Sequence, residues 1–199
     1  MINNLENRRE RWGHPCAWGP IGRHDLTDSL PYPFEDAGIG EIFEGKDVLE
    51  IGPGAGRQFE RLCGCTKSYY LCDICQSVLD QPLFAISNGK FLVEDWGQYL
   101  GQLFDVVHFW YVIHHIRQDE LRNFFAFLSR HLRNGGRIAF NNPEPINVQG
   151  DPAGDGCGTT YTDPEIIGAA VEGLSLEILS VTSIQKKSTG HVFLLGKTA

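Results

Sequence analysis

A glycine-rich stretch after an apolar segment is the clearest chemical signal in this sequence. Residues 48–57 read VLEIGPGAGR, an apolar run with one acid, Glu50, followed by the three glycines Gly52, Gly54 and Gly56. This order predicts a strand, a tight turn and a helix that begins near residue 57. Glycine suits such a turn because it tolerates positive φ and because a Cβ would keep a cofactor away from the backbone. The first amides of the helix can then bind a carboxylate or a phosphate.

The glycine spacing separates two classes of cofactor. A dinucleotide-binding turn has the spacing Gly-x-Gly-x-x-Gly, whereas here the third glycine comes one residue early and Arg57 follows it. This spacing argues against a nucleotide-dependent oxidoreductase. The pattern Glu50-x-Gly52-x-Gly54-x-Gly56 resembles motif I of the class I methyltransferases that depend on S-adenosylmethionine (SAM). The resemblance implies SAM as the cofactor and S-adenosylhomocysteine (SAH) as the product.

A second acid, Asp73, ends the apolar segment 67–73, which we expect to be a strand. An ionised acid at this position can accept two hydrogen bonds from the 2′,3′-diol of a ribose. Ile74 would then lie against the ribose or the adenine. The alternative is that Asp73 only caps the helix that follows.

A third acid, together with an aromatic residue, ends a short strand predicted over residues 89–96. By resemblance to the family, Asp95 would face the amino group of adenine, and Trp96 would offer its backbone amide to the ring. An exposed turn acid is the alternative interpretation of Asp95.

The most apolar segment, 104–116, reads FDVVHFWYVIHHI and resembles the fourth strand of the same family. The resemblance places Phe109 near the methionine part of the cofactor and Tyr111 on the substrate side. His114 and His115 are candidate catalytic bases. The alternative, which relatives of the family favour, is that both are packing and hydrogen-bonding residues of the turn.

The remaining elements must hold these residues in place. Apolar residues at helical spacing predict a helix over 121–132, and a strand follows over 134–140. Asp163 is expected to cap a further helix, and 176–184 and 191–197 predict a closing antiparallel hairpin. Strands that alternate with helices require a parallel sheet covered on both faces. With the closing hairpin added, we expect an α/β, doubly wound, mostly parallel seven-stranded sheet. The resemblance to the methyltransferase family implies the strand order 3-2-1-4-5-7-6, in which strand 7 is antiparallel.

The chain is expected to divide into an N-terminal extension, 1–45, and a SAM-dependent methyltransferase domain, 46–199. The extension carries aromatic residues that either pack on the sheet or line a substrate pocket as part of a lid: Trp12, Trp18 and Tyr32. Residues 141–145, NNPEP, resemble a signature of amino methyltransferases, but that signature follows the fourth strand and these residues follow the fifth. We therefore reject it, while keeping Glu144 as a candidate residue at the rim of the substrate pocket.

Composition limits the function classes further. The 199 residues are 42% apolar and 21% charged, without an apolar run long enough to span a membrane, so we expect a soluble cytoplasmic protein. A formal net charge of −8 argues against a nucleic-acid substrate. Six cysteines include Cys63-x-Cys65 and Cys72-x-x-Cys75, but Cys72 falls within a predicted strand, so reduced thiols are favoured and no metal site is expected.

Together these features predict an enzyme that transfers a methyl group from SAM to a small-molecule oxygen or nitrogen nucleophile. Such an enzyme mainly has to align its reactants. Two alternatives stay open: a non-catalytic module that binds SAM or SAH, including a partner subunit of a methyltransferase, and a methyltransferase that acts on a macromolecule. The oligomeric state does not follow from the sequence.

Overall fold

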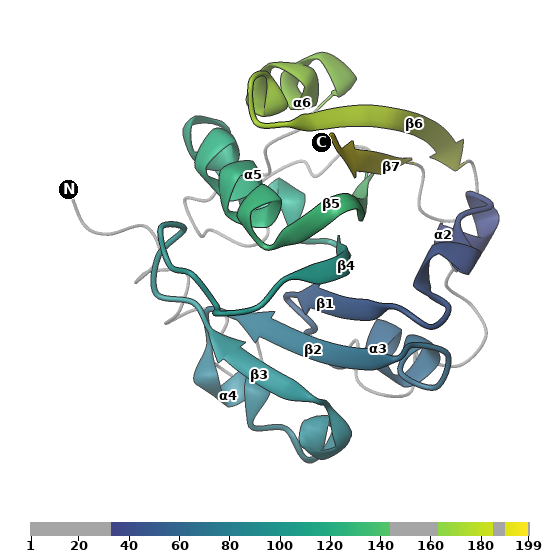
Figure 1. The fold of residues 1–199 in the computed structure, drawn as a ribbon, viewed down its shortest axis with the longest axis vertical. Coiled ribbons are helices and arrows are strands. Elements are labelled where there is room, and N and C mark those ends of the chain that lie inside the picture. The colour runs from purple at the N-terminus through teal and green to yellow at the C-terminus, as the bar shows by residue number, and fades with distance from the viewer. Residues whose placement is uncertain (1–32, 144–162, 185–189, 199) are drawn as a thin grey trace, which may run out of the picture.

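A seven-stranded sheet forms the centre of the molecule (Figure 1). The computed structural model describes residues 33–143, 163–184 and 190–198. The strands run in the order β3-β2-β1-β4-β5-β7-β6. They are β1 (Asp47–Ile51), β2 (Ser68–Asp73), β3 (Gly89–Leu92), β4 (Phe104–Phe109), β5 (Leu132–Pro143), β6 (Leu176–Ile184) and β7 (Gly190–Lys197). The first five are parallel, and β7 is antiparallel to both β5 and β6, so the predicted class and strand order are confirmed.

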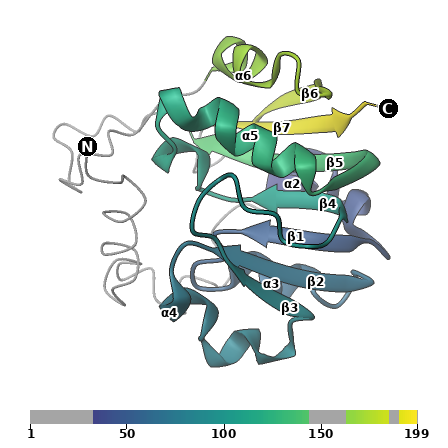
Figure 2. The ribbon, with the colours of Figure 1, turned by 60° about the vertical axis from the view of Figure 1, so that its left-hand side comes forward.

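Helices cover both faces of this sheet (Figure 2). The helical elements are α2 (Pro33–Asp36), η3 (Gly40–Phe43), α3 (Arg57–Leu62), α4 (Gln76–Leu79), η4 (Pro82–Ile86), η5 (Ile113–His115), η6 (Gln118–Glu120), α5 (Leu121–Arg130) and α6 (Pro164–Val171). One core cluster packs α5 and α6 against one sheet face, and a second packs α2, α3 and α4 against the other. The side chain of Asp163 accepts a hydrogen bond from the amide of Ile166 at 2.8 Å, which confirms the predicted helix cap.

The burial of the strands explains why the sequence shows little alternation. All five residues of β1 are buried, as expected for a parallel strand covered on both faces. The third strand is shorter than predicted and ends at Leu92, so Asp95 and Trp96 lie in the turn that follows it.

The described part of the N-terminal extension packs on the sheet. Phe34 and Phe43 are buried, and their rings meet the ring of His108 edge-on at centroid distances of 5.5 and 5.3 Å. This contact agrees with the packing interpretation for residues 33–45. Trp12, Trp18, Tyr32 and Glu144 lie outside the described residues.

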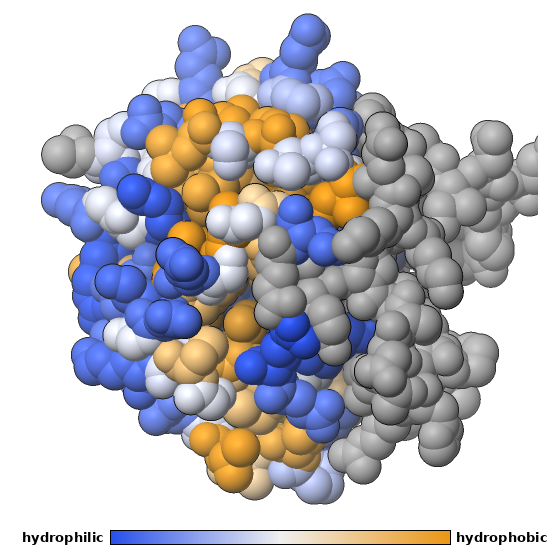
Figure 3. All heavy atoms as spheres, turned by 90° about the vertical axis from the view of Figure 1, so that its right-hand side faces the viewer, coloured by the Kyte–Doolittle hydropathy of each residue, from blue (hydrophilic) through white to orange (hydrophobic). Residues whose placement is uncertain are grey.

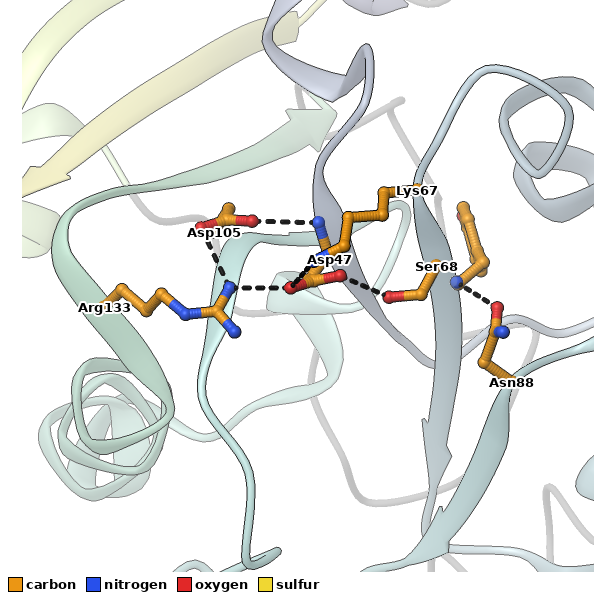
Figure 4. Close-up of polar contacts among 7 residues, drawn as sticks. Asp47, Lys67, Ser68, Asn88, Asp105 and Arg133 are labelled. Carbon is orange, nitrogen blue, oxygen red and sulfur yellow. Dashed lines mark hydrogen bonds and ion pairs between the residues drawn. The ribbon is translucent and has the colours of Figure 1, made fainter.

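Paired charges gather at the edge of the sheet where the parallel strands begin (Figure 4). One nitrogen of Arg133 lies 3.0 Å from Asp47 and 2.9 Å from Asp105. The amide of Asp47 donates to Asp105 at 2.9 Å, and its carboxylate accepts from Lys67 and Ser68. The network therefore joins the beginnings of β1, β2, β4 and β5.

The surface shows apolar side chains among hydrophilic ones on the side of β6 and α2 (Figure 3). Leu179 and Val181 of β6 are among the exposed large apolar residues. No described helix has the length and apolar character needed to cross a membrane. Cys63, Cys65, Cys72 and Cys75 are free thiols, and the described residues contain no cluster of His, Cys, Asp or Glu suited to a metal ion.

Candidate functional site

The candidate site residues gather at the opposite edge of the sheet, where the parallel strands end. In the register of the sheet, Ile51 pairs with Cys72 on one side and with Phe109 on the other. Phe109 in turn pairs with Phe140. The residues that come next, namely Gly52, Asp73, Trp110 and Asn141, therefore lie along a single edge of the sheet.

The glycine turn has the backbone conformation that its sequence predicts. Gly52, Gly54 and Gly56 have φ values of +66°, +52° and +84°, a region that residues with a Cβ rarely adopt. A Cβ on Gly52 would lie 2.7 Å from Cγ2 of Val112, and one on Gly56 would collide with Leu83. At Gly54, by contrast, no heavy atom of the described residues lies within 4 Å of that position. Gly54 is therefore where a ligand could approach the backbone of the turn.

Glu50 belongs to a buried polar network beneath this turn. The hydroxyl of Tyr69 donates to Oε2 of Glu50 at 2.9 Å and lies 2.6 Å from Nε2 of His108. Burial raises the pKa of Glu50 to about 8 and lowers the pKa of His108 to about 3. Both side chains are therefore mainly uncharged at neutral pH, and Glu50 is only 2% exposed. The Glu50 side chain is therefore enclosed within the protein, where Tyr69 is its hydrogen-bond partner.

Asp73 ends β2 beside the glycine turn, where the amide of Gly52 donates to the carbonyl of Cys72 at 2.8 Å. One oxygen of Asp73 accepts a hydrogen bond from the amide of Cys75 at 2.8 Å, a local turn contact, whereas the N-cap of α4 is Cys75 and no side chain caps that helix. Asp73 is 9% exposed, and burial raises the pKa of its carboxyl group to about 7. A ligand that donates hydrogen bonds would favour its ionised form. Ile74, the next residue, is half-buried.

The turn after β3 is fixed from outside by α5. Asp95 is exposed and accepts a hydrogen bond from the amide of Gly97 at 2.5 Å. Arg130 donates to the carbonyl oxygens of Gly97 and Trp96 at 2.6 and 3.4 Å. The ring of Trp96 packs against Phe124 at 5.0 Å. Its indole Nε1 is buried without a hydrogen-bond partner among the residues that the structure describes.

The turn after β4 presents aromatic rings. The side chain of Phe109 is fully buried and stacks on Phe140 at 4.7 Å, so it faces the core. Tyr111 has φ +54° and meets Trp110 edge-on at 5.2 Å. The rings of His114 and His115 are half-buried and lie 3.9 Å apart, and His114 is 6.2 Å from the ring of Tyr111. The structure thus brings the proposed substrate residue and the two candidate bases together.

Two side chains at this edge were given no role in the sequence analysis. Arg57 follows the last glycine, and its Nε is buried with no hydrogen-bond partner among the described residues. The sequence did contain a signal for Arg57, because it places a cation directly after a turn that is predicted to bind an anion. Asn141 accepts a hydrogen bond from the amide of Tyr111 at 2.7 Å. The sequence offered no signal for this contact because the two residues are 30 positions apart.

Comparison with solved structures shows the same fold in other proteins. The N-methyltransferase NodS from Bradyrhizobium japonicum, in complex with SAH, is 18% identical, with a TM-score of 0.69 over 99% of this chain and 100% of that chain. The magnesium protoporphyrin IX methyltransferase ChlM from Synechocystis PCC 6803, with bound SAM, is 13% identical, with a TM-score of 0.64 over 100% and 99%. The DhpI–SAH complex is 16% identical, with a TM-score of 0.69 over 100% and 98%. Each of these structures contains its own SAM or SAH, and all share the fold of this chain.

Sequence comparison gives the family. No curated protein matches the sequence. A family model described as a methyltransferase domain matches residues 24–149, which is more than half of the chain. This match covers the glycine turn, Asp73 and the whole segment from β1 to β5. The chain therefore belongs to the methyltransferase domain family.

Proposed function

We propose that this protein transfers a methyl group from SAM to an oxygen or nitrogen atom of a small molecule and releases SAH. The observation that carries the proposal is the position of Gly54 and Asp73. A backbone turn open to a ligand lies beside a buried carboxyl group, at the edge where ligands bind in open α/β sheets.

The residues at this edge suit each part of SAM. Asp73 would accept hydrogen bonds from the ribose diol, with Ile74 beside it. Asp95 and the backbone of Trp96 would meet the adenine. The turn over Gly52, Gly54 and Gly56, with the backbone of Phe109, would hold the methionine part. When bound, SAM supplies a methyl carbon already activated by its sulfonium, so the protein has to align the acceptor and exclude water.

The acceptor side is proposed from the turn after β4. Tyr111 would contact the acceptor, and His114 or His115 would remove a proton if the nucleophile is a hydroxyl. An amine that is already neutral needs no such base. Trp12, Trp18, Tyr32 and Glu144 stay predictions for the same pocket, as does the division into an extension, 1–45, and a domain, 46–199.

Two observations favour a small acceptor over a macromolecule. The formal net charge is −8, which disfavours an approach to a polyanion. Two structural neighbours are a magnesium protoporphyrin IX methyltransferase and an N-methyltransferase, which favours a small acceptor or an amine. A cytoplasmic location stays a prediction.

Isothermal titration with SAM, SAH and NAD tests the cofactor assignment. We expect SAM and SAH to bind with micromolar dissociation constants and NAD not to bind. Release of SAH in the presence of a panel of hydroxyl and amine metabolites then tests catalysis. Cofactor binding with no turnover on any acceptor would favour the non-catalytic alternative, and absence of binding to both sulfur ligands would overturn the proposal.

A further inference from the structure

We propose that Asn141 is a positioning residue that holds the turn after β4 against the glycine turn, and so forms the wall for the methionine part of SAM. This inference rests on the proposed function. Its physical basis is a hydrogen bond from the amide of Tyr111 to Oδ1 of Asn141, 2.7 Å long.

The hydrogen bond supports a backbone conformation that Tyr111 does not favour. Of the non-glycine residues described, only Tyr111 and Ser175 have positive φ, each at +54°. A left-handed backbone is a genuine outlier for a bulky side chain and persists only where surrounding contacts impose it. The amide of Tyr111 is fixed by a side chain that is itself 4% exposed. Without that acceptor, the turn is free to relax toward negative φ.

The position of Asn141 is fixed by the strands around it. Asn141 follows Phe140 in β5 and pairs with Val192 of β7. The ring of Phe140 is stacked between Phe109 at 4.7 Å and Phe193 at 4.9 Å. The acceptor oxygen is therefore held by the middle of the sheet, so it can set the position of the turn.

The left-handed residue directs the chain back onto the glycine turn. Val112, the next residue, contacts Gly52 so closely that a Cβ on that glycine would lie 2.7 Å from its Cγ2. Asn141, Tyr111, Val112 and Gly52 thus form one continuous series of contacts. A relaxed Tyr111 would move Val112 away and open the side of the turn that faces the methionine part, while Asp73 and the adenine side would stay in place.

Two ligands distinguish this role from a general loss of structure. SAH contains the amino-acid part, and 5′-methylthioadenosine keeps the adenosine and the sulfur but lacks it. For Asn141→Ala we expect the dissociation constant of SAH to rise about tenfold, as for loss of one well-placed hydrogen bond, and that of methylthioadenosine to change less than about twofold.

Asn88→Ala is the matched control. Oδ1 of Asn88 accepts a hydrogen bond from the amide of Tyr69, also at 2.7 Å, away from the carboxyl edge (Figure 4). This variant removes the same kind of bond, and neither ligand should bind more than about twofold differently. Equal weakening of both ligands by Asn141→Ala, or no weakening of SAH, would overturn the inference.

Two substitutions at Tyr111 test the same hydrogen bond by changing its donor residue instead of its acceptor. Proline fixes φ near −65° and has no amide hydrogen, so Tyr111→Pro should cause the same selective loss of SAH with Asn141 intact. Glycine adopts positive φ without strain. In a protein carrying Tyr111→Gly, adding Asn141→Ala should therefore weaken SAH less than about threefold.

The positioning role would be contradicted if Tyr111→Pro bound SAH as tightly as the wild-type protein. It would also be contradicted if Asn141→Ala weakened SAH binding by the full tenfold in the protein that carries Tyr111→Gly. Failure of the wild-type protein to bind SAH would overturn the proposed function instead. The two failures are therefore separate.

Discussion

The two edges of this parallel sheet use polar residues in opposite ways. Where the strands begin, Asp47, Asp105 and Arg133 form a network of paired charges (Figure 4). Hydrogen bonds from Ser68, then from Lys67 and Arg133, lower the pKa of Asp47 despite its burial. Charge is thus stabilised at this edge by the protein itself.

Where the strands end, the protein leaves polar groups poorly compensated. Burial raises the pKa of Glu50 to about 8 and of Asp73 to about 7, and Tyr111 has a left-handed backbone. Perturbed carboxyl groups and strained residues cluster at functional sites because a ligand completes their interactions. The first edge therefore contributes stability, whereas the second gives up stability for ligand binding.

The largest expected effect is on binding at the second edge. Asp73→Asn keeps an oxygen that can accept from Cys75 but removes the charge that a ribose diol would meet. The dissociation constant of SAH should rise about 100-fold, since two charge-assisted hydrogen bonds are lost or weakened. The melting temperature without ligand should stay constant or rise, because a buried ionisable group has been replaced by a neutral one. Titration calorimetry and thermal unfolding measure the two effects.

A fall in melting temperature with unchanged SAH binding would show that Asp73 stabilises the fold and does not bind the cofactor. It would assign Asp73 only a structural role in the turn after β2, through its hydrogen bond with Cys75.

The opposite result is expected at the first edge. Asp47→Asn should lower the free energy of unfolding by about 1–2 kcal/mol, because Arg133 and Lys67 lose a charged partner but keep solvent contact. SAH binding should change less than about twofold, and urea unfolding gives the energy. The control is Arg117→Gln, which breaks an exposed ion pair with Asp119 and should cost less than about 0.5 kcal/mol. An Asp47 variant as stable as the control would show that the network does not stabilise the fold.

The sequence predicted the fold well because its signals are local. Apolar segments typical of strands alternate along the chain with segments whose apolar residues have helical spacing. The glycine turn and Asp73 each come at the end of a strand segment, so their place at one edge of a parallel sheet followed from this alternation. The orientation of Phe109 did not follow. Its strand is buried on both faces, and no polar alternation marks which face a side chain takes.

Contacts between distant residues were also beyond the sequence. Asn141 and Tyr111 meet only because β5 lies beside β4, and a tyrosine carries no sequence signal for positive φ. Asp47 and Arg133 meet across the same sheet. Such pairs depend on register, which a single sequence does not give.

The smallest expected effect is the pH dependence of cofactor binding, which should depend on Asp73 and not on Asp47. Folding raises the pKa of Asp73 to about 7 by burial, so part of the protein holds a proton there near neutral pH. Only the ionised carboxylate accepts both hydrogen bonds of a diol, so SAH affinity should increase as pH rises through this pKa. Between pH 6.5 and 7.5 the gain should be about threefold. Asp73→Asn should remove it, whereas Asp47→Asn should leave it intact, because the pKa of Asp47 is lowered and its carboxyl is already ionised throughout this range. A gain that persists in Asp73→Asn would assign the titration to Glu50, whose pKa is raised to about 8 by burial and by the nearby charge of Asp73.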